Sequence, residues 1–250
     1  MICCRRCPTP SRPGQSERGE PPFKHIRDYA PVTKLRDQVA GMSAAERAKL
    51  ALRISRRKAK AAAAEPVQIQ HDAENRFEPF PLTDLQQAYW VGRSSAFDIG
   101  NVASHCYLEV EADFDIERLQ QAWREMIERH DMLRAIIHPD GQQQVLETVP
   151  DYEIVTIDLR DCSQAERDAQ LAAIYNELSH QVLDPAVWPM FDIKAAYLPD
   201  NKVRVCFSVD ALIADGWSLF LIFTEWAKLY HEPGQLLEPT EISFRDYVLA

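Results

Sequence analysis

Two carboxylates and a hydroxyl lie close together at Asp210, Asp215 and Ser218. Carboxylates accept and return protons, and a serine hydroxyl donates and accepts hydrogen bonds. The neighbouring residues are largely apolar, and a buried carboxylate without a partner is costly. The spacing therefore predicts a functional site built around one or both carboxylates.

Two elements position these residues. From Val203 to Asp210 apolar and polar side chains alternate, which is typical of a half-buried strand that ends at Asp210 on its polar side. Asp215 and Gly216 then form a tight connection. The residues from Leu219 to Tyr230 fit a helix with one wide apolar face.

The segment from Asp210 to Ser218, DALIADGWS, resembles the D-x-x-x-x-D-x-x-S signature of the heterocyclization domains of non-ribosomal peptide synthetases. These domains are a branch of the condensation-domain superfamily, whose ordinary members carry H-H-x-x-x-D-G at this place. In that register Asp210 and Ala211 replace the two histidines, and Asp215 with Gly216 keeps the D-G pair. The histidine associated with peptide condensation is therefore missing.

Two further motifs stand ahead of this one in family order. The segment FPLTDLQQAYWVGR resembles the opening heterocyclization motif F-P-L-T/S-x-x-Q-x-A-Y-x-x-G-R. Its matching positions are Phe80, Pro81, Leu82, Thr83, Gln86, Ala88, Tyr89, Gly92 and Arg93. RHDMLR, from Arg129 and His130 to Arg134, resembles the R-H-x-M/I-L element, although Arg134 is nearer to the ordinary condensation pattern than the Pro of many heterocyclization domains.

The resemblance implies an α+β fold of the chloramphenicol-acetyltransferase type, in which a mixed sheet packs with helices. Complete domains consist of two such lobes arranged as a V, with the substrates meeting in a tunnel between them. We expect residues 76–250 to form the N-terminal lobe only. The C-terminal lobe, which carries the polar pair thought to promote cyclodehydration, is then missing, and we expect the isolated chain to be inactive.

The chemistry implied by the resemblance joins a carrier-bound acyl group to the amine of a carrier-bound Cys, Ser or Thr. The side-chain thiol or hydroxyl then adds to the new amide carbonyl, and loss of water gives a thiazoline or oxazoline. Upstream and downstream carrier domains are the expected partners. They deliver phosphopantetheine arms, and no cofactor is expected to bind this chain directly.

The site residues receive different expectations. Asp210 is the better candidate for contact with the reacting groups. Asp215 is expected to be structural, because in the superfamily this Asp forms an ion pair with an Arg, which Arg129 or Arg134 would supply. Ser218 is expected to cap the following helix, with a substrate contact as the alternative.

The remaining motif residues are assigned to packing or to the tunnel. His130 is expected to support packing, and Tyr89 fits the core face of a helix that Thr83 caps. Gly92 and Arg93 are expected to shape the acceptor side of the tunnel, with a helix C-cap as the alternative for Gly92.

Other segments predict the rest of the lobe. A strand is expected around residues 106–110, a helix from Asp115, and a capped helix from Ser163 toward Val182. Hairpins are expected around the Asp140-Gly141 turn and around residues 199–201.

Composition and motifs argue against membrane-spanning, secreted, zinc-binding and nucleotide-binding proteins. The chain is 46% hydrophobic, has no apolar run long enough to span a membrane and lacks a secretory signal, so we expect a cytoplasmic globular protein. The six cysteines have no zinc-ligand spacing, and we expect no metal site. No nucleotide-binding motif and no phosphopantetheine attachment pattern occurs.

Charge is unevenly distributed. Residues 1–65 hold 15 Lys and Arg against 6 Asp and Glu, whereas the rest of the chain is strongly acidic. We expect a disordered or weakly ordered tail over residues 1–42 and a basic linker or docking helix over residues 43–75 that begins at a Ser43–Glu46 capping box. A nucleic-acid interface is the alternative, but no aromatic residues are interleaved with the charges.

Three hypotheses follow: a truncated heterocyclization domain, an ordinary condensation or acyltransferase enzyme of the same fold, and a non-catalytic docking fragment. The missing histidine argues against the second.

Overall fold

The computed structural model describes residues 43, 46, 49, 68–93 and 103–250. The chain divides into two units, Met1–Val67 and Gln68–Ala250. In the first unit the Ser43 hydroxyl accepts from the Glu46 N–H at 3.3 Å, and the Glu46 carboxylate accepts from the Ser43 N–H at 2.8 Å, so the capping box forms. Residues 44–45, 47–48 and 50–67 of the expected basic helix lie outside the described residues. Its expected end at residue 75 was wrong, because residues 68–75 are described, form no helix and belong to the second unit.

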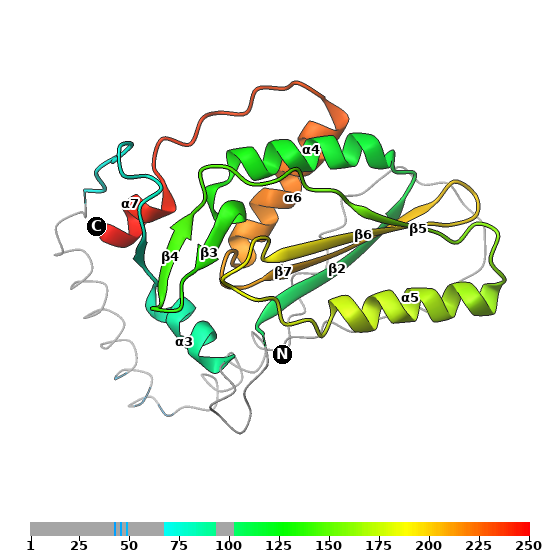
Figure 1. Cartoon of the computed structure of the whole chain (residues 1–250), viewed down its shortest axis with the longest axis horizontal. Helices are drawn as coiled ribbons and strands as arrows, with labels where there is room; N and C mark the ends of the chain where they lie inside the picture. The colour runs from blue at the N-terminus through cyan, green and yellow to red at the C-terminus, as the bar shows by residue number, and fades with distance from the viewer. Residues whose placement is uncertain (1–42, 44–45, 47–48, 50–67, 94–102) are drawn as a thin grey trace. The chain divides into compact units, whose positions relative to one another are not determined.

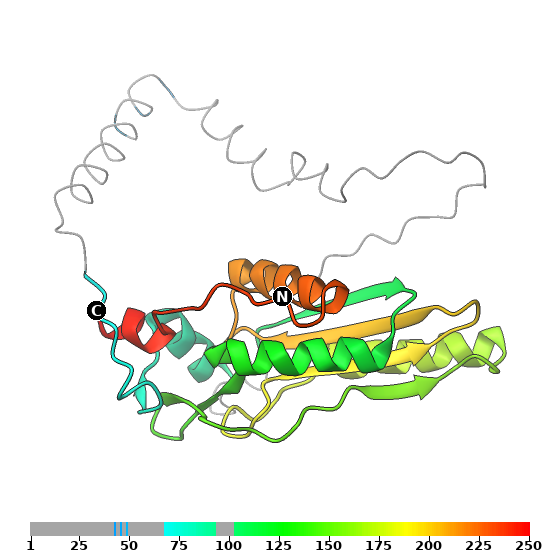
Figure 2. The ribbon, with the colours of Figure 1, turned by 90° about the horizontal axis from the view of Figure 1, so that it is seen from above.

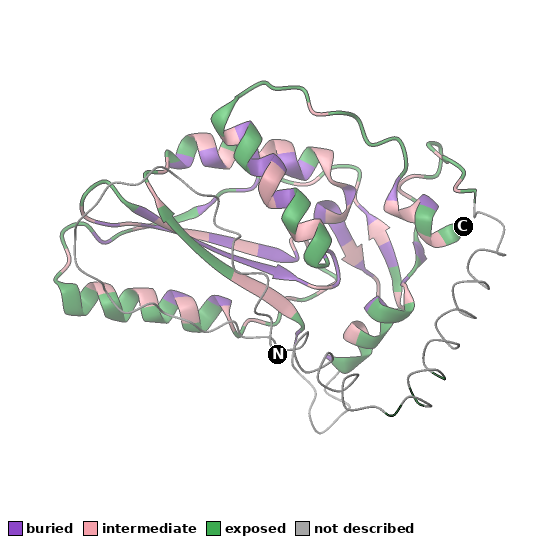
Figure 3. Ribbon diagram, turned by 180° about the vertical axis from the view of Figure 1, so that it is seen from behind, coloured by how far each residue is buried: buried purple, intermediate pink, exposed green. Residues whose placement is uncertain are grey.

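A four-stranded mixed sheet forms the centre of the second unit (Figure 1). Its order is β2 (His105–Ala112), β7 (Val203–Asp210), β6 (Phe191–Tyr197) and β5 (Val155–Asp158). The β5–β6 pair is parallel and the other two pairs are antiparallel. The central strands are buried along most of their length (Figure 3).

Helices cover both faces of this sheet. The side chains of Val205, Phe207 and Val209 point to one face, because strand residues alternate, and they share a core with α4 (Ile116–Arg129) and α6 (Gly216–His231). Cys206 points to the other face and packs with α5 (Gln164–Leu178). Figure 2 shows α4 and α6 running beside the sheet.

A second, three-stranded antiparallel sheet lies at the end of the lobe where the opening motif begins. It has the order β1 (Phe80–Pro81), β4 (Gln142–Val145), β3 (Ala135–Ile137). The short helix η2 (Asp131–Arg134) leads into β3. Gly141 turns the β3–β4 hairpin with a φ of 81°, a conformation that glycine adopts without steric cost. The helix α3 (Asp84–Gly92) follows β1 directly.

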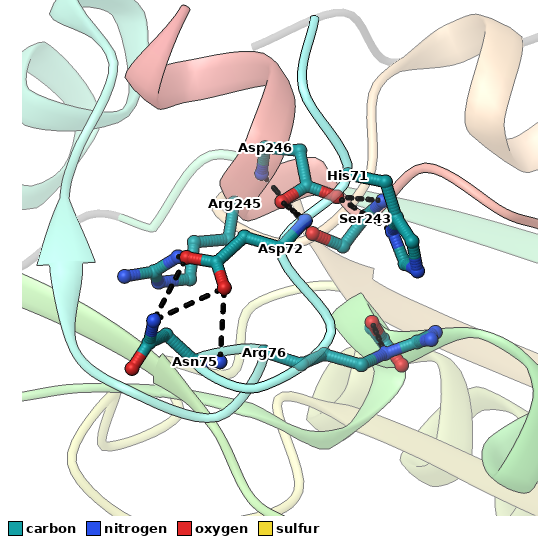
Figure 4. Close-up of polar contacts among 8 residues, drawn as sticks. His71, Asp72, Asn75, Arg76, Ser243, Arg245 and Asp246 are labelled. Carbon is teal, nitrogen blue, oxygen red and sulfur yellow. Dashed lines mark hydrogen bonds and ion pairs between the residues drawn. The ribbon is translucent and has the colours of Figure 1, made fainter.

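The segment before β1 is tied to the last helix, α7 (Phe244–Leu249), by a polar cluster (Figure 4). Asp246 is buried and accepts hydrogen bonds from the backbone N–H groups of Asp72, at 3.2 Å, and Ser243, at 2.9 Å. Arg245 forms an ion pair with Asp72 at 3.2 Å. These contacts, together with the packing of Phe80 on Phe244, make residues 71–76 part of the lobe.

The expected α+β class and most expected elements are confirmed. Thr83, Asp115 and Ser163 are the N-caps of α3, α4 and α5. Both hairpins form, and the turn between β6 and β7 places Asp200 and Asn201 at positive φ. One boundary was wrong: α5 ends at Leu178 rather than near Val182.

Candidate functional site

Asp210, the last residue of β7, forms a buried ion pair with Arg93 at the end of α3. The Arg93 Nη2 atom lies 2.7 Å from both carboxylate oxygens of Asp210. Only 2% of Asp210 and 9% of Arg93 is exposed. The Leu212 N–H also donates to Asp210 Oδ1 at 2.9 Å, so the carboxylate holds the start of the motif loop as well as the arginine.

This environment differs from the one expected for Asp210. The alternation of β7 placed its side chain on a polar face near the reacting groups, but the carboxylate is enclosed and both of its oxygens are engaged. The polar surroundings are supplied by Arg93, which lies 117 residues earlier in the chain and which we had assigned to the tunnel. A catalytic role for Asp210 remains a prediction.

Asp215 is the N-cap of α6, and the ion pair predicted for it with Arg129 or Arg134 is wrong. Its Oδ1 accepts from the Ser218 N–H at 2.8 Å and from the Ser218 hydroxyl at 2.7 Å. The hydrogen bond from the Ser218 N–H has the larger effect on the pKa of Asp215, and together with the bond from the Ser218 hydroxyl it lowers that pKa below its usual value. Because the helix begins at Gly216, the expectation that Ser218 is the cap is also wrong: Ser218 is the third helical residue and helps to orient the capping carboxylate.

Arg129 and His130 share one acidic partner on α6. The Glu225 Oε2 lies 2.8 Å from Arg129 Nε and 2.8 Å from His130 Nε2. Burial lowers the pKa of His130, although the hydrogen bond with Glu225 opposes this shift. The cluster joins α4 to α6, which agrees with the packing role expected of His130.

Arg134 closes the C-terminal end of α4. Its Nη1 atom donates to the carbonyls of Ile127 and Glu128 at 2.5 and 2.6 Å, and its Nε donates to Leu146 at 3.0 Å. Its Nη2 contacts Asp131 Oδ1 at 2.9 Å, and Asp131 Oδ2 accepts from Arg76 at 2.8 Å. Arg134 therefore satisfies carbonyl groups that the end of a helix leaves without partners.

The opening motif packs against the Asp210–Asp215 loop at two points, at Arg93 and at Gln86. The Gln86 Nε2 atom donates to the Leu212 carbonyl at 2.8 Å. Phe80 and Pro81 form β1, and Phe80 is 1% exposed. Two motifs far apart in sequence thus form one polar junction.

Tyr89 and Gly92 have structural roles in α3. Tyr89 is partly buried and packs against the main core, as its expected helix face requires. Gly92 is the last helical residue, and the C-cap position falls at Arg93 with a φ of −85°. The alternative that Gly92 is the C-cap is therefore wrong, because Arg93 holds that position.

Three residues at these junctions escaped sequence reasoning. Gln143 is 1% exposed and bonds to Gln86; the signal was a glutamine at an inward position of a strand. Glu225 lies among the apolar residues of α6 and carried no motif. His105 is the register partner of Asp210 on β2, and its Nδ1 lies 3.2 Å from the Ala103 carbonyl.

Within the part of the chain that the structure describes, no cluster of three His, Cys, Asp or Glu residues is arranged to hold a metal ion. Among the same residues, no helix has the length and apolarity needed to cross a membrane.

The comparisons with known proteins agree with this architecture. The family model of the condensation domain matches residues 78–250, so the chain belongs to the condensation-domain family. It is 41% identical over 179 residues to bacitracin synthase 1 of Bacillus licheniformis, a match that covers 72% of this chain and 3% of that protein. It is 39% identical over 171 residues to pyochelin synthetase PchF of Pseudomonas aeruginosa, covering 68% of this chain and 9% of that protein.

Solved structures give the same result. The EpoB cyclization–docking bidomain of a Sorangium cellulosum non-ribosomal peptide synthetase matches with a TM-score of 0.70 and 36% identity. That match covers 80% of this chain and 41% of the bidomain. The synthetase FmoA3 matches with a TM-score of 0.63 and 34% identity, over 74% of this chain and 18% of that one. The expected resemblance to a lobe of a heterocyclization-type condensation domain is confirmed.

Proposed function

We propose that this chain supplies the N-terminal lobe of a heterocyclization domain in a non-ribosomal peptide synthetase. In this proposal the complete domain condenses a carrier-bound acyl donor with a carrier-bound Cys, Ser or Thr. It then cyclodehydrates the product to a thiazoline or oxazoline. The chain spans only a small part of the length of the curated relatives it matches. Condensation and cyclodehydration are therefore proposed for the complete domain.

One observation carries the proposal. β7 ends with a carboxylate at Asp210, and the methyl group of Ala211 follows it, where ordinary members of the family carry two histidines. The carboxylate is already paired with Arg93. A site whose proton acceptor is a histidine of this motif is therefore not built here. The relative phenyloxazoline synthase MbtB of Mycobacterium tuberculosis, 37% identical over 164 residues and named for a heterocyclic product, supports the same reading.

The proposed reaction has two stages. The acceptor amine attacks the donor thioester carbonyl, a C–N bond forms, the C–S bond breaks, and the donor carrier regains its thiol with the amine proton. The acceptor thiol or hydroxyl then adds to the new amide carbonyl, and the resulting ring loses one water. The partner carriers deliver both substrates on phosphopantetheine arms.

The residues of this lobe act mainly by positioning. The Arg93–Asp210 ion pair and the Gln86–Leu212 hydrogen bond fix the motif loop, and Asp215 fixes the first turn of α6. Groups held in a fixed geometry lower the barrier by orientation, whether or not they exchange protons. Asp215 lies at the exposed helix start and is the motif carboxylate that solvent reaches.

We further propose that the isolated chain makes no heterocycle, because it spans 41% of the crystallised bidomain. The experiment incubates donor and cysteinyl carrier proteins with this chain, and in parallel with the chain extended through the second lobe. We expect product only from the extended protein. Heterocycle formation by residues 1–250 alone would contradict this proposal.

Docking is a second candidate function, favoured by the basic N-terminal region. Residues 1–65 carry a large excess of Lys and Arg, and the matched EpoB structure is described as a cyclization–docking bidomain. A deletion of residues 1–65 tests it: binding to an upstream synthetase subunit should weaken while the fold of the lobe is retained. Unchanged binding would exclude docking through this region.

A further inference from the structure

Two buried glutamines form a reciprocal amide pair between α3 and β4. The Gln86 Nε2 donates to the Gln143 Oε1 at 2.8 Å, and the Gln143 Nε2 donates to the Gln86 Oε1 at 3.0 Å. The two side chains are 7% and 1% exposed. Each amide has one further N–H. Gln86 directs it to the Leu212 carbonyl at 2.8 Å, and Gln143 directs it to the Pro81 carbonyl at 2.9 Å.

The direction of every bond in this pair follows from the capping box of α3. The Thr83 N–H is a donor and lies 3.0 Å from Gln86 Oε1, so the oxygen of Gln86 has to face the helix start. The Gln86 NH₂ group then faces Leu212 and Gln143. Gln143 in turn presents its oxygen to that NH₂ group and its own NH₂ group to Pro81. All four amide N–H groups meet an acceptor, as buried donors require.

The pair therefore connects the Asp210–Asp215 loop to the three-stranded sheet, which contributes no residue to the DALIADGWS segment. Gln143 lies on β4, directly opposite Phe80 of β1, whereas Leu212 lies inside the Asp210–Asp215 segment. A Gln86 side chain without Gln143 keeps the Thr83 contact but loses the partner that fixes the plane of its NH₂ group. Gln143 acts on the loop through Gln86.

We infer that Gln143 is a positioning residue for the candidate site: by holding the Gln86 amide it fixes the Leu212 carbonyl, and with it the loop between Asp210 and Asp215. This second anchor is neutral, unlike the Arg93–Asp210 pair, and its partners Thr83, Pro81 and Leu212 carry no titratable side chain. Its effect on catalysis rests on the proposed function, whereas its effect on the loop does not.

The structural test uses the full chain with carbonyl ¹³C labels at leucine. The Leu212 carbonyl resonance reports its hydrogen bond directly. In a folded Gln143→Leu variant we expect this resonance to move upfield, toward the position of a carbonyl without a donor. Gln142→Leu is the matched control, because Gln142 is exposed on the same strand. An unchanged Leu212 resonance in Gln143→Leu would overturn the inference.

Gln143→Glu gives a second readout, which also serves if Gln143→Leu folds poorly. A protonated glutamic acid donates its O–H to Gln86 Oε1 and accepts from Gln86 Nε2, so it rebuilds the reciprocal pair. The ionised carboxylate cannot donate. We expect the Leu212 resonance of this variant to return toward the wild-type position as the pH falls, and a resonance independent of pH would count against the pair.

The catalytic test uses the complete two-lobe protein with loaded carriers. For Gln143→Leu we expect a loss in kcat on the order of tenfold to a hundredfold with KM little changed, the pattern of misplaced rather than lost substrate contacts. Unchanged kcat with an altered Leu212 resonance would show a purely structural pair and overturn the positioning role. If the wild-type protein makes only open-chain amide, the proposed heterocyclization fails, while the carbonyl measurement and the rate of amide formation still test Gln143.

Discussion

The Nη2 atom of Arg93 lies 2.7 Å from both carboxylate oxygens of Asp210, although 117 residues separate them in the chain. This contact joins the end of the opening motif to the end of the motif strand. It also accounts for a carboxylate that is almost fully buried, because an unpaired charge at this place would be strongly destabilising. The ion pair therefore gives Asp210 a structural role that does not depend on a second lobe.

Removing the Asp210 carboxylate should destabilise the folded lobe strongly. Asp210→Ala leaves the buried guanidinium of Arg93 without its charge partner, and we expect the free energy of unfolding to fall by about 3–5 kcal/mol. Urea denaturation of the full chain measures this. Asp113→Ala, which breaks the solvent-exposed pair with Lys202, should have a far smaller effect, because water screens an exposed ion pair.

A double substitution separates the ion pair from simple packing. Replacing both Arg93 and Asp210 by Met removes the two buried charges together, so the double variant should be more stable than Asp210→Ala. If the double variant loses as much stability as Arg93→Met and Asp210→Met added together, the two side chains are not coupled, and the role assigned to the pair is wrong.

The Arg129–His130–Glu225 cluster should make the lobe less stable in acid. Burial lowers the pKa of His130 below 6.5 in the folded protein. As the pH falls below 6.5, His130 is therefore protonated in the unfolded protein before it is protonated in the folded one, and this favours unfolding. Burial by itself raises the pKa of Glu225, but the hydrogen bonds from Arg129 and His130 together have a larger, opposite effect. The pKa of Glu225 is therefore below its usual value. Both groups therefore stabilise the fold at neutral pH. The His130 contribution is lost as the pH falls below 6.5, and that of Glu225 as it falls below 4.5.

Urea-denaturation midpoints of the full chain, measured at several pH values between pH 7 and pH 5, test this prediction. His130→Asn should flatten the decline over this interval, whereas His180→Asn, at an exposed position, should leave it unchanged. An identical decline in wild type and His130→Asn would assign the acid sensitivity to other groups.

Arg134 should be more important for stability than its place beside a motif suggests. Lysine cannot reproduce its planar set of donors to Ile127, Glu128, Leu146 and Asp131. We expect Arg134→Lys to reduce the free energy of unfolding by about 1–3 kcal/mol, because buried carbonyls lose their donors. Arg124→Lys is the matched control, since Arg124 makes a single bond to the Tyr152 carbonyl. Similar losses in both variants would argue against a special role for Arg134.

Asp215 should behave as a helix cap in stability measurements. Asp215→Ala should lose about 1 kcal/mol, and Asp215→Asn should lose much less because the amide oxygen still accepts from Ser218. Ser218→Ala keeps its backbone N–H and should have a small effect. A large loss in Ser218→Ala would mean that the hydroxyl, rather than Asp215, holds the start of α6.

Local patterns predicted the elements well. The alternation before Asp210, the N-caps at Thr83, Asp115 and Ser163, and the glycine at position 141 each depend on a few neighbouring residues. Motif order also predicted the family, because three short patterns each had to fall in sequence.

Partner choice in the site was not predictable in the same way. Asp215 could have paired with any nearby arginine. Arg93, Arg129 and Gln143, the partners of Asp210, Glu225 and Gln86, lie 117, 96 and 57 residues away in the chain, and the packing of α3, α4, α6 and β4 brings them together. Gln143 had no motif, and only its burial and its bonds reveal it. The packing between helices and strands determines these roles, and the spacing of residues within one segment does not predict that packing.

The most direct test of the proposed function is intact-protein mass spectrometry of the acceptor carrier after incubation with the donor carrier and the complete two-lobe protein. With a cysteinyl acceptor we predict a product lighter by one water than the open-chain amide. With an alanyl acceptor, which lacks the side-chain nucleophile, we predict the open-chain amide without loss of water. Only open-chain amide from the cysteinyl acceptor would contradict the assignment to heterocyclization.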